Sequence, residues 1–221
     1  MRVVVTGGAG FVGSHVVDSL VADDHHVLVI DALSATAHAG PPDYLNDRAE
    51  YHWIDITDAT KVCAIVDGAD AVCHQAARVG LGRDFGDVDA YAFDNDLGTA
   101  RLLRALHETS FRGRLVLASS MVVYGEGRYR CRTHGVVGAG LRTADAISAA
   151  RFEPPCPVCS RDLLPEPVPE TAPADPRSVY AATKLHQEHL CFLFGRNRGV
   201  PVTALRYHNV FGPRMPTKTL W

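Results

Sequence analysis

The chain has 221 residues, of which 47% are hydrophobic and 21% are charged, and it carries a formal net charge of -3 at pH 7. This composition is typical of a globular protein, and the length allows one sizeable domain or slightly more. The charge provides no basic surface for nucleic acid, and the longest apolar runs fall far short of the roughly 20 residues in a membrane-spanning helix. Because no signal-peptide pattern precedes the first predicted strand, we expect a cytoplasmic protein without nucleic-acid or membrane partners.

Short apolar runs rich in β-branched residues alternate with helical patterns along the chain. The predicted strands cover residues 2–6, 26–31, 51–54, 70–76, 114–120 and 201–210. The predicted helices cover residues 11–21, 59–66, 90–109 and 179–194. Continuous apolar strands indicate burial on both faces, and the alternation indicates right-handed crossovers between parallel strands. The sequence therefore predicts an α/β fold, a doubly wound parallel sheet in one Rossmann-like domain over residues 1–221.

The segment "TGGAGFVG" (6–13) follows the first strand and opens the first helix. Glycines permit the tight turn and the close approach of a phosphate, and the N–H groups at the start of the helix bind a pyrophosphate. Asp31 ends the second strand about 20 residues further on. Its carboxylate would accept hydrogen bonds from a ribose 2′-OH and repel a 2′-phosphate, so NAD is favoured over NADP. The alternative is a structural glycine turn.

Two further strand ends are candidates for cofactor contact. Asp55 follows the third strand and either reaches the adenine edge or serves as a helix N-cap at or near that position. The segment "HQAA" (74–77) closes the fourth strand with small residues. Such a backbone can run close to a flat cofactor, although a close-packed strand end would have the same sequence.

Residues 126–177 interrupt the alternation, because they are rich in Gly, Pro and Cys and show little periodicity. A loop of this length inside a compact domain is either disordered or functional. It contains "CRTH" (131–134) and "CPVC" (156–159).

Two ligand pairs, each with a two-residue gap, suit a tetrahedral zinc site. The sequence therefore predicts one structural zinc held by Cys131, His134, Cys156 and Cys159. The alternatives are free cysteines in a mobile loop, or a disulfide, which the cytosol disfavours.

Candidate catalytic side chains follow the fifth strand and begin the last predicted helix. Ser119 and Ser120 end that strand at the carboxyl edge of the sheet, where doubly wound folds bind ligands. Tyr180 and Lys184 lie four residues apart and would share one helix face. A cation beside a phenol lowers the pKa of the phenol and makes it a general base. The alternative is a solvated lysine next to an interfacial tyrosine.

Taken together, these motifs resemble the extended short-chain dehydrogenase/reductase family, specifically its NAD-dependent nucleotide-sugar epimerases and dehydratases of the UDP-glucose 4-epimerase type. The matching segments are "TGGAGFVG", "HQAA", "NDLGT" (95–99), "SSMVVYG" (119–125), "YAATK" (180–184) and "LRYHNVFGPR" (205–214). Their order and spacing extend through nearly all of the chain except residues 126–177, which we call the insert.

The resemblance implies a role for each matching residue. Tyr180 would be the catalytic acid/base, with Lys184 lowering its pKa and bonding the nicotinamide ribose, and Ser120 would hydrogen-bond the reacting sugar hydroxyl. Asn209 would join Ser120 and Tyr180 in binding the substrate. The implied NAD contacts are Gly7, Gly10, Phe11, Val12, Gly13, Asp31, Asp55, Ile56, Gln75, Ala76, Ala77, Asn95, Ser119, Tyr180, Lys184 and His208.

Three of these positions also have simpler interpretations. Asn95 would order the active-site backbone and the cofactor, or would be a helix N-cap. His208, beside the nicotinamide, and Asn209, beside the nucleotide sugar, could equally be polar strand-end residues.

The implied reaction is NAD-dependent epimerisation of a UDP- or dTDP-hexose through a transient 4-keto intermediate. Family members that are 4,6-dehydratases usually follow the Ser/Thr with an Asp–Glu pair, whereas this chain has Met121 and Val122, which cannot transfer protons. This difference favours epimerisation over dehydration, with keto-sugar reduction as a further alternative.

The family usually continues well beyond the position of Trp221 into a substrate-binding domain, so we expect that domain to be largely missing. A truncated, non-catalytic NAD-binding protein is therefore another alternative. The resemblance also implies a homodimer.

Overall fold

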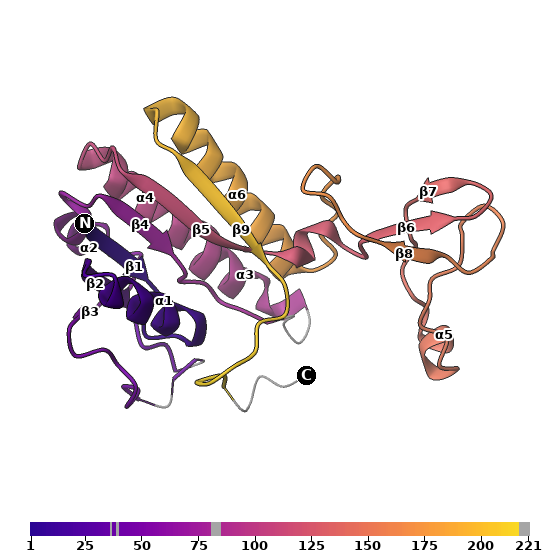
Figure 1. Cartoon of the computed structure of the whole chain (residues 1–221), viewed down its shortest axis with the longest axis horizontal. Coiled ribbons are helices and arrows are strands. Elements are labelled where there is room, and N and C mark those ends of the chain that lie inside the picture. Colours follow the sequence, from indigo (N-terminus) through magenta and orange to yellow (C-terminus); the bar gives the residue numbers. More distant parts are fainter. Residues whose placement is uncertain (36, 39, 81–84, 217–221) are drawn as a thin grey trace.

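A six-stranded parallel sheet forms the centre of the structure, a computed structural model that describes residues 1–35, 37–38, 40–80 and 85–216. Its strands are β1 (Arg2–Thr6), β2 (His26–Asp31), β3 (Glu50–Trp53), β4 (Ala71–His74), β5 (Arg114–Ser120) and β9 (Val202–Tyr207). Their order in the sheet is β3-β2-β1-β4-β5-β9, and every neighbouring pair is parallel (Figure 1). The predicted Rossmann-like α/β fold is confirmed.

The strand order reverses between β1 and β4. From β1 the chain builds the sheet outward through β2 and β3, and from β4 it builds in the other direction through β5 and β9. Loops leaving the carboxyl ends of β1 and β4 therefore diverge, and doubly wound folds bind ligands in the resulting crevice.

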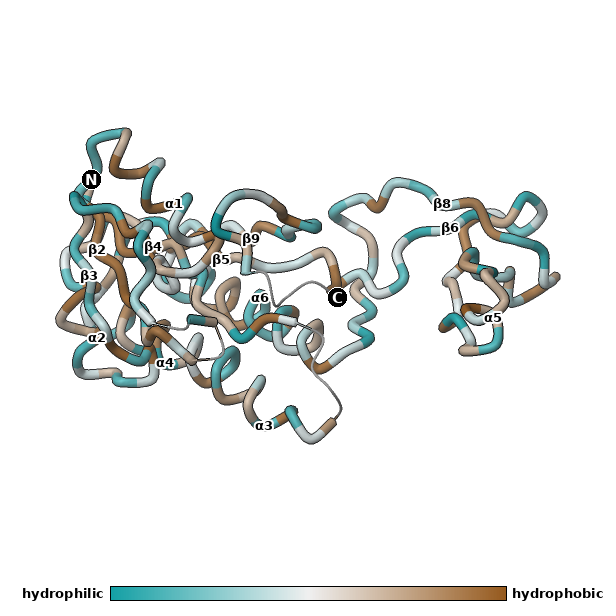
Figure 2. Tube along the Cα trace, turned by 90° about the horizontal axis from the view of Figure 1, so that it is seen from below, coloured by the Kyte–Doolittle hydropathy of each residue, from teal (hydrophilic) through white to brown (hydrophobic). Residues whose placement is uncertain are grey.

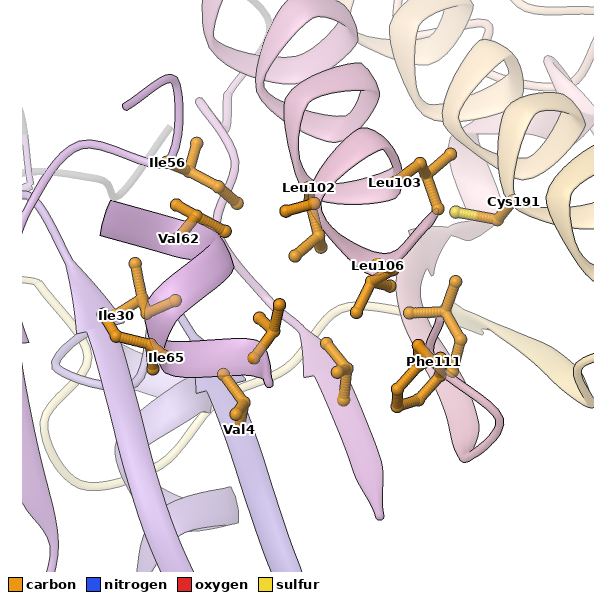
Figure 3. Close-up of a cluster of buried hydrophobic side chains, with 14 of the residues drawn as sticks. Val4, Ile30, Ile56, Val62, Ile65, Leu102, Leu103, Leu106, Phe111 and Cys191 are labelled. Carbon is orange, nitrogen blue, oxygen red and sulfur yellow. The ribbon is translucent and has the colours of Figure 1, made fainter. Parts of the chain in front are cut away.

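Helices cover both faces of the sheet. On one face, helix α1 (Phe11–Ala22) packs through Val17 and Val21 against valines of β1 and β2. On the other face lie α2 (Ala59–Val66), α4 (Gly98–Glu108) and α6 (Val179–Arg198). Figure 3 shows the second cluster, in which leucines of α4 lie between Val62 of α2 and Cys191 of α6. Alternate residues of β1 serve the two clusters, as expected from the period of a strand.

The predicted helix at 90–109 consists of three consecutive segments. These are α3 (Val88–Tyr91), the π-helical η2 (Ala92–Leu97) and α4. A short 3-10 turn, η1 (Phe85–Asp87), precedes them. A π turn carries an extra residue, and such turns are frequent at functional sites. The extra residue in this helix falls in the "NDLGT" region that the sequence had singled out.

Several predicted boundaries differ from the structure, and the strand predicted at 70–76 is the shorter β4, Ala71–His74. Strand β9 ends at Tyr207, so residues 208–210 are irregular, and α6 continues beyond the predicted end to Arg198. Gly199, with a φ of 68°, ends that helix in the left-handed conformation that favours glycine. Burial on both faces is correct for the central strands and wrong for β3 and β9, since both are edge strands whose residues are only partly covered.

The insert forms a small antiparallel sheet of its own. The turn η3 (Met121–Tyr124) leads into β6 (Arg128–Cys131), β7 (Gly135–Val137), α5 (Ala144–Ser148) and β8 (Leu164–Glu166), with strand order β7-β6-β8. Figures 1 and 2, viewed from directions 90° apart, both show this small sheet extending away from the six-stranded sheet and its helices, which we call the larger body. The alternative that the whole insert is disordered is therefore wrong.

Among the described residues, no helix combines the length and apolarity that crossing a bilayer requires.

Candidate active site

A cavity of about 770 Å³ opens at the carboxyl edge of the sheet, where the strand order reverses. It is lined by loops after β1, β2, β3, β4, β5 and β9 and by the start of α6. The site residues predicted from the sequence that line it are Gly7, Gly10, Phe11, Val12, Gly13, Asp31, Asp55, Ile56, Gln75, Ala76, Ala77, Ser119, Ser120, Tyr180, Lys184, His208 and Asn209. Segments that lie far apart in the sequence thus meet in one place.

The glycine turn after β1 permits contacts that a side chain would prevent. Gly7 has a φ of 69°, and a Cβ there would lie 2.6 Å from the backbone nitrogen of Ala76. A Cβ on Gly13 would lie 2.0 Å from the carbonyl oxygen of Gly7. The first N–H groups of a helix have no intrahelical partner, and Gly10 caps α1 without a side-chain acceptor. The turn therefore presents N–H groups and a positive helix end to the cavity, as a pyrophosphate requires.

Asp31 is held in place at the end of β2. Its Oδ2 accepts from the backbone N–H of Ala9 at 3.0 Å and its Oδ1 from that of Leu33 at 2.9 Å. The carboxylate thus links the end of β2 to the glycine turn while it lines the cavity. Tyr44, which sequence reasoning missed, also lines the cavity and donates its hydroxyl to the carbonyl of Ala9 at 3.0 Å.

The helix N-cap near Asp55 is a different residue. Asp55 accepts hydrogen bonds from the backbone N–H and the hydroxyl of Thr57, at 2.8 and 2.6 Å. The cap of α2 is Asp58, whose side chain accepts from the backbone N–H of Lys61. Asp55 therefore lines the cavity from a turn that precedes the helix.

Ser120, Tyr180 and Lys184 converge on the cavity from β5 and α6. Helix α6 begins where the Ser178 side chain accepts from the backbone N–H of Ala181 at 3.1 Å, which places Tyr180 and Lys184 in its first two turns. The Lys184 side chain is buried, and its Nζ donates to the carbonyl of Ala118 at 2.9 Å. The shared helix face predicted for Tyr180 and Lys184 is therefore turned toward the end of β5.

In the protein without cofactor, burial opposes the predicted lowering of the phenol pKa by Lys184. Burial raises the pKa of Tyr180, and a hydrogen bond with Ser120 only partly opposes this increase. Burial also lowers the pKa of Lys184 to about 8. The physical reason is the position of the ammonium, which bonds a carbonyl oxygen and lies 5.9 Å from the centre of the Tyr180 ring. Desolvation therefore outweighs the attraction between the two groups.

Asn95 lies behind the cavity and does not line it, so the NAD contact implied for it stays a prediction. It is fully buried inside η2, which also excludes the N-cap interpretation. Its Oδ1 accepts from the backbone N–H of Arg78 at 2.7 Å, and its Nδ2 donates to the carbonyl of Arg78 at 3.1 Å and to Thr183 Oγ1 at 2.9 Å. Asn95 thus joins the loop after β4 to α6, as expected of a residue that orders the active-site backbone.

A buried ion pair behind Ser119 was not predicted. Ser119 donates its hydroxyl to Glu188 Oε1 at 2.5 Å, and Arg206 donates to both carboxylate oxygens of Glu188 at 2.9 and 2.8 Å. Arg206 also donates to the hydroxyl of Tyr124 at 2.6 Å. The sequence contains a signal that could have predicted the position of Glu188, because Glu188 follows Lys184 by four residues and so shares its helix face. The Ser119 hydroxyl is therefore engaged by α6, although the residue lines the cavity.

The four predicted metal ligands come together on the insert. The ligand atoms of Cys131, His134, Cys156 and Cys159 all lie within 4.8 Å of one another. None of the four lines the cavity, which is formed by the larger body.

Residues 3–137 and 159–220 match the profile of the NAD dependent epimerase/dehydratase family. The chain belongs to this family. Residues 138–158, in the middle of the insert, fall outside the match.

Relatives and solved structures of the family are similar to nearly the whole chain. It is 33% identical over 217 residues to dTDP-L-rhamnose 4-epimerase from Burkholderia thailandensis, with 96% of this chain and 58% of that protein covered. UDP-glucose 4-epimerase from Thermus thermophilus in complex with NAD has a TM-score of 0.72 at 31% identity, covering 98% of this chain and 58% of that chain. UDP-glucose 4-epimerase from Thermotoga maritima with UDP-glucose has a TM-score of 0.73 at 27% identity, covering 97% and 57%. The chain thus spans 58% of the length of the curated relative.

The Glu188–Arg206 pair predicts a pH-dependent contribution to stability. Burial raises the pKa of Glu188, but hydrogen bonds from Arg206 and Ser119 outweigh burial, so the pKa lies below its ordinary value of 4.5. The stabilisation is then present above pH 4.5 and is lost as the pH falls through the folded-state pKa. We expect Glu188→Gln to lower the free energy of unfolding by about 2 kcal/mol at pH 7. Urea denaturation at several pH values should show this difference shrinking in acid.

The matched control is Glu108→Gln. Glu108 accepts from Arg104 at 2.7 Å in an exposed pair, which should contribute far less. Equal destabilisation by the two substitutions, or a difference that persists at low pH, would contradict the assignment.

Proposed function

We propose that this chain carries the cofactor site and the catalytic residues of an NAD-dependent nucleotide-sugar epimerase, acting through a transient 4-keto sugar. The observation that carries the proposal is the meeting of Ser120, Tyr180 and Lys184 in one cavity with the glycine turn and Asp31. One end of the cavity suits a dinucleotide, and the other end offers a hydroxyl, a phenol and an ammonium.

The residues present fit NAD. The glycine turn and the start of α1 would hold the pyrophosphate, Asp31 would accept from the adenosine ribose, and Lys184 would lie near the nicotinamide ribose. When bound, oxidised NAD supplies a hydride acceptor and a positive charge next to the sugar.

Tyr180 would take the proton from the hydroxyl on the reacting sugar carbon. Ser120 would hold that hydroxyl in place, since it lies at the end of β5 and hydrogen-bonds Tyr180. Lys184 keeps a positive charge at the base of the cavity, fixed by the Ala118 carbonyl. Because burial raises the pKa of the free phenol, the proton transfer requires the additional charge of the oxidised cofactor. The same phenol would return the proton after the keto sugar has turned over.

Two apolar residues next to Ser120 support epimerisation over 4,6-dehydration. Met121 and Val122 line the cavity where an acid–base pair would be needed to eliminate water. Keto-sugar reduction uses the same three catalytic groups, so product analysis separates it from epimerisation.

The expected substrate is a UDP- or dTDP-hexose. This is supported by relatives and structural neighbours whose names specify dTDP-L-rhamnose and UDP-glucose as substrates. A homodimer and a cytoplasmic location stay predictions. The predicted zinc has a structural role in this proposal and no chemical one, because its four candidate ligands lie on the insert and none of them lines the cavity.

Because the chain spans 58% of its relative's length, an NAD-binding protein without catalysis is the second candidate. Binding of NAD without turnover of any UDP- or dTDP-hexose would favour that candidate. Epimerised product would exclude it.

Cofactor selectivity tests the role of Asp31. We expect the chain to bind NADH more tightly than NADPH, and Asp31→Asn to weaken NADH binding about tenfold or more, because a charged acceptor for the ribose is lost. Fluorescence titration with both nucleotides measures the two affinities. Asp23→Asn, an exposed substitution just after α1, is the control and should change neither. Equal affinities for NADH and NADPH in the unaltered chain would contradict the assignment.

Replacing the phenol tests the catalytic assignment. Tyr180→Phe should reduce epimerisation of UDP-glucose, UDP-galactose or dTDP-sugars by roughly 10²–10⁴-fold, because the acid/base is lost. NADH affinity should change little, which shows that the cofactor site is intact. Tyr51→Phe is the matched control, since its ring stacks on Trp53 outside the cavity. Unchanged turnover in Tyr180→Phe would end the mechanistic proposal.

A further inference from the structure

The insert brings four metal-ligating atoms together in a regular arrangement. Cys131 Sγ lies 3.7 Å from Cys159 Sγ and 3.4 Å from His134 Nδ1, and Cys156 Sγ lies 3.7 Å from the same nitrogen. Zinc bonds of about 2.3 Å to sulfur and about 2.0 Å to nitrogen place tetrahedral ligands about 3.8 Å apart for two sulfurs and about 3.5 Å apart for sulfur and nitrogen. These three distances therefore match the edges of a zinc tetrahedron, and all four ligand atoms lie within 4.8 Å of one another.

The two ligand pairs are presented by turns of the same construction. Cys131 Sγ accepts from the backbone N–H groups of the residues two and three positions later, and Cys156 Sγ does the same. The residue immediately after each pair has a positive φ, 72° at Gly135 and 58° at Ser160. Positive φ is uncommon for a serine, so the second turn is held by its surroundings. The two turns therefore present their first cysteine in the same way.

The hydrophobic core of the insert is too small to hold this arrangement by itself. Its strands have four, three and three residues. The buried residues of its cluster are Tyr129, Cys131, Ala139, Cys156 and Leu163. Two of these five are candidate ligands. Units with so little core usually depend on a metal, a disulfide or oligomerisation.

We propose that Cys131, His134, Cys156 and Cys159 bind one structural zinc ion that holds the insert together. Three thiolates and an imidazole in tetrahedral array are the ligands and geometry that zinc prefers among the first-row metals. All four positions are filled by protein, so the ion would have no open site for catalysis. The family profile does not match residues 138–158, the segment that brings Cys156 beside Cys131.

Zinc binding would stabilise the fold of the insert and would leave the structure of the cofactor site unchanged. The insert is fastened to the larger body at its base, where the backbone N–H of Asp175 donates to the carbonyl of Val123 at 2.9 Å and Arg206 donates to the carbonyl of Glu170 at 3.2 Å. Neither contact includes a metal ligand. Removal of zinc should therefore release the small sheet while the dinucleotide site persists.

Metal analysis of the full chain, purified without chelators, tests the proposal directly. Elemental analysis should find roughly one zinc per chain, and cobalt(II) exchanged into the site should show the visible bands of a tetrahedral thiolate complex. Protein without zinc, or with a Cys131–Cys159 disulfide found by mass spectrometry of alkylated peptides, would overturn it.

Ligand variants separate a specific site from zinc bound elsewhere. Cys156→Ser should lose the metal, whereas His134→Cys, which keeps four zinc ligands, should retain it. Cys63→Ser is the control, because this cysteine lies on α2 outside the cluster. Zinc retained in full by Cys156→Ser, or lost from Cys63→Ser, would contradict the assignment.

The structural role has a readout independent of activity. Treatment with a zinc chelator and a reductant should expose the insert to trypsin at Arg142 and Arg151, with NADH affinity unchanged. Equal resistance to trypsin with and without metal would contradict the structural role.

Discussion

The candidate site depends on how α6 is fixed across the end of β5. Lys184 is buried there, and removing an ammonium from water is costly unless it is hydrogen-bonded. Its bond to the carbonyl of Ala118 satisfies this requirement and sets the rotation of the helix. Tyr180, one turn earlier, consequently lines the cavity, and Glu188, one turn later, meets Ser119 and Arg206. One helix face thus supplies both the phenol and the ion pair that secures the adjacent strands.

This arrangement makes the chemistry conditional on the cofactor. A phenol in a buried site keeps its proton more firmly than a phenol in water, and burial raises the pKa of Tyr180 even with Lys184 on the same helix face. Only a second positive charge beside the phenol would favour the phenolate. Proton removal is therefore proposed to occur when oxidised NAD is bound, which would prevent the free protein from acting as a general base without a hydride acceptor.

Much of the fold could be predicted from the sequence because local patterns determine it. Apolar strand periodicity, the glycine turn and the capped helices each act within a few residues, and the alternation of strands and helices indicates a parallel sheet. The π turn at Asn95 could not be predicted, because a single extra residue leaves the helical pattern nearly unchanged. The Glu188–Arg206 pair joins residues on different elements, and the charge of a residue does not reveal its burial. The effect of burial on the pKa of Tyr180 was missed for the same reason, since spacing gives proximity but not desolvation.

The ionisation of Tyr180 can be followed by tyrosinate ultraviolet absorbance during a pH titration, with the signal of Tyr180→Phe subtracted. The proposed mechanism predicts a pKa above the ordinary value of 10.0 in the protein alone and a clear decrease when oxidised NAD is added, but not when NADH is added. A pKa that is already low without cofactor, or one that oxidised NAD leaves unchanged, would contradict it.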